Sequence, residues 1–443
     1  MKEKRTKIRG KIALLLAVGA LTLFLSCHFV FQASADSGEA KPALSTALSP
    51  AIEILAEKLS MTKSGILGHD LCFTAADFDR AMGYECYSVT MLTLPDHAAG
   101  TLLLSEKPVK EGQVIPRGDL GDLRFVPACT VPSAAAFTYG AVGTGSQYEI
   151  ECRLYLLETL NIAPVGPASA KDDVVQTFSG ISYFGVFEGN DPEGDALHFE
   201  VTQYPRKGIL FTDGEGGYRY APTGGFTGKD DFSYVCVDRY GNRSAEIPVS
   251  VRVSGISSGV VYSDMREHPA GVAATTLAEK KIMTGKTLGG RYIFAPEESI
   301  TREEFAAVLM TALSVAPEKA DLSAYADGND VTEVFAPYLT AAGTNGYLND
   351  GILTAGDLLK PGDTITKAEA ALLLTAAAGL SKDTVETFAP EETTLPEWAA
   401  APVAAMQELG ILQGNDAAEM LTAPMTRGDT AISVCALLEY LGK

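Results

Sequence analysis

Three basic residues, Arg302, Lys367 and Arg427, occupy the same position in three similar segments of the chain. Each follows a threonine, and an acidic residue comes two positions after each of them. A threonine and an acid three residues apart form the capping-box pattern, which predicts a helix that begins at the basic residue. The positive end of the helix dipole disfavours a cation there by roughly 0.3–1 kcal/mol. Helix N-termini and cationic side chains both bind anions, so the repeated choice predicts three anion-binding positions.

The three segments belong to longer repeats that must position the cations. Their capping threonines are 65 and 60 residues apart, and an apolar stripe at helical spacing follows the first one. An aromatic residue begins each repeat. Two positions later stand Asp264 in the first repeat, Asp327 in the second and Pro390 in the third. Each repeat predicts a helix, a glycine-rich loop and a capped helix. Periods this long are typical of tandem units that pack their apolar faces against one another.

The order of these features resembles the S-layer homology (SLH) domain. The first copy shows it in Tyr262-Ser263-Asp264 and in Ile300-Thr301-Arg302-Glu303-Glu304. Three tandem copies near a chain end are usual in that family, and the copies in this sequence span residues 260–317, 322–381 and 385–443. The resemblance implies an all-α pseudo-threefold bundle that holds a pyruvylated secondary cell-wall polysaccharide non-covalently.

The same resemblance assigns roles to individual residues. It implies that Arg302, Lys367 and Arg427 bind the acidic ketal of the sugar, and that Asp264 and Asp327 shape the same pockets. An alternative is that these motifs only cap helices and pack the bundle.

The three copies depart unequally from the SLH pattern. Pro269 and Phe335 stand where the family prefers Trp, and the third copy, which contains Arg427, lacks the aspartate. Lys367 supplies charge without the planar fork of arginine. We therefore expect at least one degenerate pocket, and we expect the best one to be lined by Arg302, whose motif is the fullest.

Two segments rich in short alternating strands precede the repeats. Both follow the order strand, Pro-to-Gly turn, apolar strand, aromatic-x-Pro and aromatic-x-Tyr, which predicts all-β sandwiches over residues 68–160 and 161–254. The second resembles the bacterial cadherin-like or immunoglobulin-like modules of surface proteins, on Asn190–Asp195 and Gly225–Phe232. A leader (residues 36–67) with a short helix over residues 51–59 comes before both. Residues 255–259 predict a flexible joint to the repeats.

Four acidic residues at predicted turns of the second sandwich could gather around Ca²⁺, which prefers clustered carboxylates. These residues are Asp191, Glu193, Asp195 and Asp238. The same residues fit tight turns, and we favour turns because the twelve-residue calcium-loop pattern is absent. The sequence indicates no other metal and no cofactor.

The first residues predict export. Residues 1–11 contain six basic residues and one acid, an apolar stretch over 12–31 follows, and Ala33-Ser34-Ala35 fits a cleavage site. Residues 1–35 are therefore expected to be a secretory signal peptide. The apolar stretch is also long enough to span a bilayer as an uncleaved anchor. Secretion permits disulfides, and one or two are expected among the four cysteines from Cys72 to Cys152.

The charge of the exported chain limits its partners. Without residues 1–35 the chain has 29 basic and 55 acidic residues, a net charge of −26. This charge excludes binding to nucleic acid or to an anionic membrane through bulk electrostatics. An acidic wall polymer would also approach against a repulsive field, so its binding must depend on a few local cations.

The sequence contains no His-Glu-x-x-His or phosphate-loop motif. It therefore predicts a non-enzymatic, secreted protein attached to the cell wall of a Gram-positive-type bacterium, with residues 256–443 sufficient for wall binding. The sandwiches would be spacers, or would bind another surface protein or a host or matrix partner. Two alternatives stay open. One is a membrane-anchored adhesin whose repeats are only structural, and the other is a wall-remodelling hydrolase.

Overall fold

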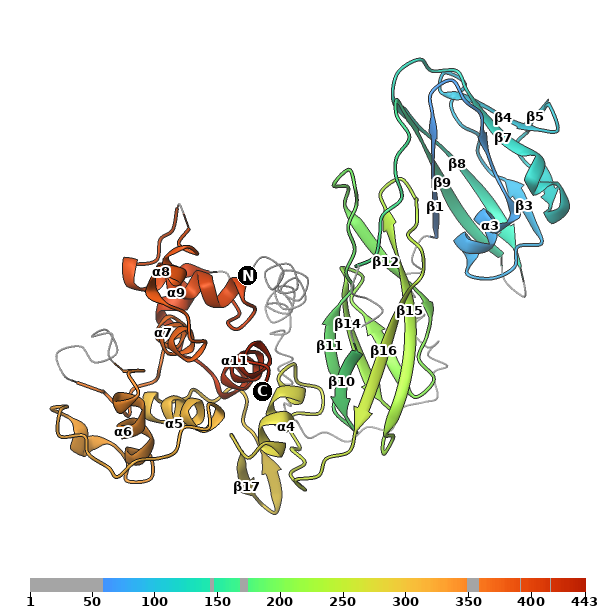
Figure 1. Ribbon diagram of the computed structural model, residues 1–443. Coiled ribbons are helices and arrows are strands. Elements are labelled where there is room, and N and C mark those ends of the chain that lie inside the picture. The colour runs from blue at the N-terminus through green and yellow to red at the C-terminus, as the bar shows by residue number, and fades with distance from the viewer. Residues whose placement is uncertain (1–58, 144–146, 168–173, 349–357, 391, 415) are drawn as a thin grey trace, which may run out of the picture.

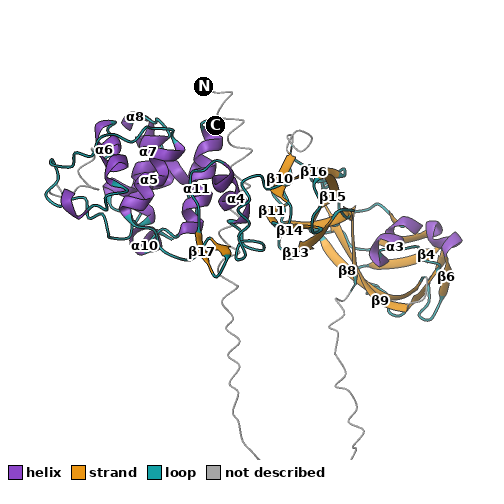
Figure 2. Cartoon of the chain, turned by 90° about the horizontal axis from the view of Figure 1, so that it is seen from below, coloured by secondary structure: helices purple, strands orange, loops and turns teal. Residues whose placement is uncertain are grey.

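The computed structural model describes residues 59–143, 147–167, 174–348, 358–390, 392–414 and 416–443. Within them the chain forms two β-rich modules followed by a region rich in helices (Figures 1 and 2). The predicted signal peptide lies outside the described residues, as does the predicted short helix at 51–59 apart from Leu59. In the described part of the chain, no helix is both long enough and apolar enough to cross a bilayer.

The first module packs two sheets around one apolar core, to which Phe125, Phe137 and Tyr139 contribute buried rings. One sheet has the order β1-β9-β8-β3-β6, formed by β1 (Ser60–Ile66), β9 (Gln147–Leu157), β8 (Ser133–Val142), β3 (Ser88–Met91) and β6 (Val114–Pro116). The other has the order β2-β7-β4-β5, formed by β2 (Leu71–Cys72), β7 (Leu123–Pro127), β4 (Gly100–Leu104) and β5 (Lys107–Pro108). The module also contains helix α3 (Ala75–Met82) and the 3-10 helix η1 (Arg117–Asp122).

Strand β1 lies where the sequence predicts a leader. It pairs in parallel with β9, from Ser60 opposite Glu151 to Ile66 opposite Leu157. Placing residues 60–66 in a leader was therefore wrong. Met61 is the only fully buried residue of this strand, so its sequence shows no clear alternation. Pairing with a strand far along the chain fixes it instead, and local propensity does not reveal such pairing.

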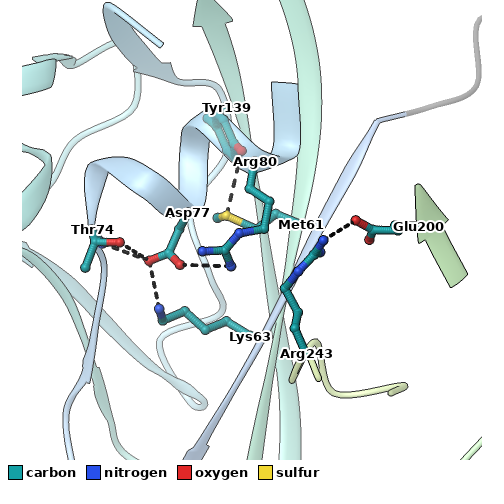
Figure 3. A network of polar contacts seen from close by, with 8 residues as sticks. All are labelled: Met61, Lys63, Thr74, Asp77, Arg80, Tyr139, Glu200 and Arg243. Carbon is teal, nitrogen blue, oxygen red and sulfur yellow. Dashed lines mark hydrogen bonds and ion pairs between the residues drawn. The ribbon is translucent and has the colours of Figure 1, made fainter. Parts of the chain in front are cut away.

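A polar network fixes β1 to α3 (Figure 3). Lys63 Nζ lies 2.8 Å from Asp77 Oδ2, and the Thr74 backbone N–H donates to the same oxygen at 2.8 Å. Burial acts to raise the pKa of Asp77, but the hydrogen bond and charge of Lys63 outweigh burial and hold this pKa below its ordinary value. The charged Asp77 carboxylate therefore ties the edge strand to the helix.

The second module is also a two-sheet sandwich, whose core includes Tyr220, Phe232 and Val251. One sheet has the order β10-β16-β15-β12, formed by β10 (Val174–Phe178), β16 (Ile247–Ser254), β15 (Gly228–Asp238) and β12 (Leu197–Gln203). The other has the order β11-β14-β13, formed by β11 (Tyr183–Val186), β14 (Gly217–Pro222) and β13 (Gly208–Thr212).

The loop after β15 docks onto the first module. A Cβ atom on Gly241 would lie 2.4 Å from the carbonyl oxygen of Thr62, and Gly241 has a φ of +87°. Asn161, in the segment between the modules, donates from Nδ2 to Asp238 Oδ2 at 2.6 Å. The two modules are therefore in direct contact, and glycine suits position 241 for both its conformation and its lack of a side chain.

The C-terminal region contains the helices α4 (Gly271–Glu279), α5 (Arg302–Ala312), α6 (Ala336–Thr344), α7 (Lys367–Ala377), α8 (Lys382–Glu386), α9 (Glu397–Glu408), α10 (Ala417–Thr422) and α11 (Arg427–Tyr440). One apolar core runs through it from Tyr262 to Leu438. The region is not all-α, because β17 (Lys286–Leu288) and β18 (Arg291–Ile293) form a hairpin. Gly289 and Gly290, with φ of +57° and +75°, make its two-residue turn, the signal that an all-α expectation overlooked.

The second module is fixed to the helical region, with α4 beside the β10–β11 end of the sandwich (Figures 1 and 2). Ser257 and Ser258, within the predicted flexible joint, donate their backbone N–H groups to the Glu279 carboxylate at 3.1 and 2.7 Å. The prediction of a flexible joint at 255–259 is therefore wrong. Glycine- and serine-rich composition indicates flexibility only where no distant element supplies a partner, and here α4 supplies one.

Lowering the pH is expected to loosen this joint. The hydrogen bonds from Ser257 and Ser258 lower the pKa of Glu279 from 4.5 to about 2. Because the folded pKa is depressed, the carboxylate stabilises the joint fully above about pH 4.5, and this contribution is lost as the pH falls from 4.5 towards 2. Amide exchange at Ser257 and Ser258, corrected for intrinsic rates, should accelerate across that window.

The matched control is Glu279→Gln, which should remove most of the pH dependence and leave both amides fast at neutral pH. Equal protection of these amides at pH 6 and pH 2.5 in the unsubstituted chain would contradict the assigned role of Glu279.

The six cysteines in the described residues are all free thiols. The prediction of one or two disulfides among the four cysteines from Cys72 to Cys152 is therefore wrong. Cys86, Cys152 and Cys236 are buried, and burial raises the pKa of each thiol. These thiols act as small apolar core residues, a role that cysteine spacing along a sequence does not distinguish from a disulfide.

Candidate functional site

The three segments that carry the cations meet in a closed ring of backbone hydrogen bonds. The Ile300 N–H donates to Met425 O at 2.9 Å, the Met425 N–H to Ile365 O at 2.7 Å, and the Ile365 N–H to Ile300 O at 3.2 Å. All three side chains are completely buried. Each of these residues directly precedes a capping threonine, so three helices begin from one triangular cluster.

The helix starts agree with the sequence prediction. Helices α5, α7 and α11 begin at Arg302, Lys367 and Arg427, and a complete capping box precedes each one. The threonine hydroxyl accepts the third backbone N–H of the helix, and the acidic side chain accepts the N–H of the threonine. This local chemistry is why the three basic residues all stand in the first turn of a helix.

The first amides of these helices are not available to an anion. The Arg302 N–H donates to Asp363 O at 3.0 Å, and the Lys367 N–H donates to Ala423 O at 3.3 Å. The Arg427 N–H donates to Glu298 O at 2.8 Å. Neighbouring loops therefore satisfy the donors that the sequence interpretation offered to a ligand. A ligand can meet the cationic side chains at these positions, but not the amides at the start of the helix.

Arg302 is largely enclosed. Its guanidinium pairs with the Glu369 carboxylate, and the two side chains are 15% and 17% exposed. Beside it lies a cavity of about 20 Å³, lined by apolar side chains such as Ala306 and Leu339. This volume is little more than the roughly 10–15 Å³ needed to hold one water molecule. This cavity therefore has no room for a sugar.

Lys367 also has a carboxylate partner. Its Nζ atom lies 2.6 Å from Glu419 Oε1, and its side chain is 12% exposed. Glu419 lies in helix α10, which precedes the third cation segment. The charge of Lys367 is therefore neutralised locally, as is that of Arg302.

Arg427 has a different environment. Its Nε donates to Phe294 O at 2.8 Å, its Nη2 donates to Thr284 O at 2.9 Å, and its guanidinium lies 5.0 Å from the centre of the Phe294 ring. Within the described residues, no carboxylate lies within ion-pair distance of Arg427. Two carbonyls and a ring face orient this cation. The pKa of Glu298 is held below its ordinary value chiefly by the hydrogen bond from Lys286 and in part by the charge of Arg427.

Asp264 and Asp327 each clamp a loop rather than point at open space. Asp264 accepts the Phe294 and Ala295 amides, the shortest bond being 2.7 Å, and Asp327 accepts the Leu359 and Lys360 amides at 2.8 and 2.7 Å. The clamped turns contain the rare positive φ values of 57° at Ala295 and 49° at Lys360.

These clamps serve cations of a different copy. Asp264 holds Phe294, whose carbonyl accepts from Arg427, and Asp327 holds Leu359, whose carbonyl accepts from Arg302 at 3.5 Å. The third copy has no aspartate of its own at this position, but Asp264 of the first copy clamps the residue whose carbonyl holds Arg427. Each of these two clamps therefore supports a cation across a boundary between copies, which the sequence interpretation did not anticipate.

The β17–β18 hairpin borders the Arg427 position. Thr284 and Phe294, the two residues that accept from Arg427, stand just before β17 and just after β18. Within the hairpin, Tyr292 is 41% exposed, and Lys286 is exposed and paired with Glu298 at 2.7 Å. The sequence interpretation missed these residues, although the Gly289-Gly290 turn between short β-forming segments was a signal for them.

The calcium candidates form turns. Asp191 accepts the Glu193 and Asp195 amides at 3.0 Å each. Asp238 Oδ1 accepts two amides of its own loop, and its Oδ2 accepts from Asn161. Across the residues that the structure describes, no group of three or more His, Cys, Asp or Glu side chains is placed to hold a metal ion.

Family comparisons match two parts of the chain. Residues 161–251 match the model described as Bacterial Ig domain, and residues 261–306 match the model described as S-layer homology (SLH) domain. The first match falls on the second β-module, and the second contains Asp264, Phe294 and Arg302. Comparison with curated proteins gives no match.

Solved structures give only weak likenesses. The chain is similar to fibronectin(III)-like modules of Clostridium thermocellum CbhA (13% identity, 45% of this chain, 93% of that chain, TM-score 0.19). It is similar to Drosophila N-cadherin EC1-3 (13%, 46%, 66%, TM-score 0.19) and to the endo-fucoidan hydrolase MfFcnA9 from glycoside hydrolase family 107 (17%, 44%, 32%, TM-score 0.16). The matches span 28% to 32% of the endo-fucoidan hydrolase chains, and TM-scores this low carry no argument.

The two family matches correspond to an SLH surface protein with an Ig-like module. The SLH domain indicates association with the cell surface and supports anchoring to the cell wall.

Proposed function

We propose that this SLH surface protein is held non-covalently on an acidic, pyruvylated secondary cell-wall polysaccharide, and that Arg427 is the cation that carries the binding. The two β-modules are displayed from this anchor as a stalk or as adhesive modules. The role is structural and adhesive, with no catalytic step.

The observation that carries the proposal is the unequal pairing of the three cations. Glu369 neutralises Arg302 and Glu419 neutralises Lys367, so an acidic sugar would have to displace a protein carboxylate at either position. Arg427 is held by carbonyls, and its charge is not matched by a carboxylate in the described residues. A pyruvyl carboxylate can pair with this guanidinium without breaking an existing ion pair.

The ring of three helix starts supports three SLH copies arranged as a pseudo-threefold bundle. The copies at 260–317, 322–381 and 385–443 each supply one residue to the hydrogen-bonded ring and one capped helix. In this arrangement the copies bring the three cations to their mutual boundaries. Among the described residues, the boundary between the third copy and the first combines an arginine that has no carboxylate within ion-pair distance with a clamped aspartate turn.

The net negative charge of the exported chain makes a local cation important for binding an acidic polymer. The exported chain has a net charge of −26, so an acidic polymer is repelled until it reaches a local cation. Binding through Arg427 should weaken as salt screens the charges.

The proposal is tested by sedimentation of the purified chain with cell walls that carry the pyruvylated polymer and with walls from which the ketal has been removed. We expect sedimentation with the first and not with the second. The combined Arg302→Ala, Lys367→Ala and Arg427→Ala variant should stay in solution with both. A chain that sediments equally with both kinds of wall would rule out the ketal as the recognised group, and release of soluble glycan from either would argue for a hydrolase.

A further inference from the structure

Residues 264–268 connect the second β-module directly to the surroundings of Arg427. On the side of Arg427, Asp264 accepts the amide of Phe294, whose carbonyl and ring hold Arg427. His268 approaches the first turn of α11, because a Cβ atom on Gly428 would lie 3.4 Å from its Cε1 atom. This short segment therefore supports both Phe294 and the first turn of α11, which surround Arg427.

On the other side, the same segment is held by the second β-module. The Ser182 N–H donates to Arg266 O at 2.8 Å, and Arg219 Nη1 lies 3.4 Å from Glu267 Oε1. Both Ser182 and Arg219 belong to the sheet β11-β14-β13 or to the turn that leads into it. Four of the five residues from Asp264 to His268 thus contact either the module or the surroundings of Arg427.

Ile181 is the apolar part of this contact. It is 1% exposed, yet it belongs neither to the core of the second module nor to the core of the helical region. Its carbonyl accepts from the buried Thr177 hydroxyl at 2.7 Å, which fixes the turn. A Cβ atom on Gly271, the first residue of α4, would lie 3.0 Å from Ile181 Cγ2. The isoleucine therefore packs against the bare backbone at the start of α4.

We infer that the second β-module is a positioning part of the wall-binding site and not only a spacer displayed by it. Docking of the module restrains residues 264–268, and that restraint keeps the Phe294 carbonyl and ring in place for Arg427. The inference rests on the proposed function. It adds to the sequence-based expectation that residues 256–443 alone are sufficient for wall binding, because without the module that binding should be weaker.

The test is Ile181→Asp in the full chain, which places a charge in the joint without touching the core of either neighbour. Undocking of the module is measured by the rate of trypsin cleavage after Arg266, because the carbonyl of Arg266 accepts the hydrogen bond from the Ser182 N–H. Order of the turn that Asp264 clamps beside Arg427 is measured by amide exchange at Phe294 and Ala295. We expect faster cleavage, exchange at both amides faster by roughly five- to tenfold, and a similar loss of affinity for the pyruvylated polymer, the low end of usual couplings between sites.

Ile209→Asp is the matched control, since Ile209 is 60% exposed on β13 and should leave all three measurements unchanged. Faster cleavage with unchanged exchange and unchanged binding would overturn the inference and leave the proposed function intact. If cleavage stays slow, Arg219→Glu is added to repel Glu267, and slow cleavage in the double variant would show that these contacts do not hold the joint. If Ile181→Asp alters the amide exchange but the unsubstituted chain does not bind the polymer, the proposed function is overturned instead.

Discussion

Replacing Arg427 with alanine is expected to weaken binding to the pyruvylated wall polymer by roughly thirtyfold. This is the effect of about 2 kcal/mol, the lower end of the cost of removing one partner of a desolvated, hydrogen-bonded charge pair. The side chain that is lost is the one cation of the three whose charge is unmatched by a carboxylate in the described residues. Equilibrium binding to immobilised polymer measures the change.

Two variants separate recognition from folding in that experiment. Arg427→Lys keeps the charge but loses the two directed bonds to Phe294 and Thr284, so it should recover only part of the affinity. Lys367→Ala removes a cation that Glu419 already neutralises, and should change affinity by less than about threefold, in line with the small net worth of such pairs. If Lys367→Ala and Arg427→Ala weakened binding equally, the assignment of one principal pocket would be wrong.

Arg302→Ala is expected to lower the free energy of unfolding of the helical region by about 3 kcal/mol, the cost of leaving a buried carboxylate without its partner. Arg302 and Glu369 are both mostly enclosed, so water replaces the lost guanidinium poorly. Glu369 would still cap α7 through the Thr366 N–H, which keeps its charge inside the structure. Denaturant unfolding followed by helical circular dichroism gives the measurement.

The double variant Arg302→Met with Glu369→Gln is the control. It removes both charges and retains the volume, and the glutamine can still cap the helix, so much of the loss should be restored. Wall binding by this double variant should remain close to that of the original chain. Loss of binding without loss of stability in Arg302→Ala would return Arg302 to the role of principal ligand-binding residue.

The parts of this molecule that sequence reasoning predicted well are those whose causes are local. Thr301, Thr366 and Thr426 each cap a helix through atoms three residues away, so the spacing alone indicates the three helix starts. The second β-module likewise shows its strands through alternation and turn residues, and its family match agrees with that reading.

The parts that sequence reasoning missed depend on contacts between distant residues. Nothing near Arg302 in the sequence shows that Glu369 will neutralise it, and nothing near Arg427 shows that Asp264 will support it. The three cations look equivalent, or even ranked in favour of Arg302, until the packing of the copies decides which carboxylate reaches which cation. Strand β1 and the joint at Ser257 and Ser258 were missed for the same reason, because their partners are β9 and Glu279.

The ring of Ile300, Ile365 and Met425 gives the three copies a cyclic order that the linear chain does not have. In an open repeat array, such as a solenoid, the last unit contacts one neighbour and can be removed with a limited loss. Here each of the three residues both donates to one copy and accepts from another, so no copy is terminal. Removing any one of them would strand a buried donor on one remaining copy and a buried acceptor on the other, which makes three the smallest number of copies that closes this anchor.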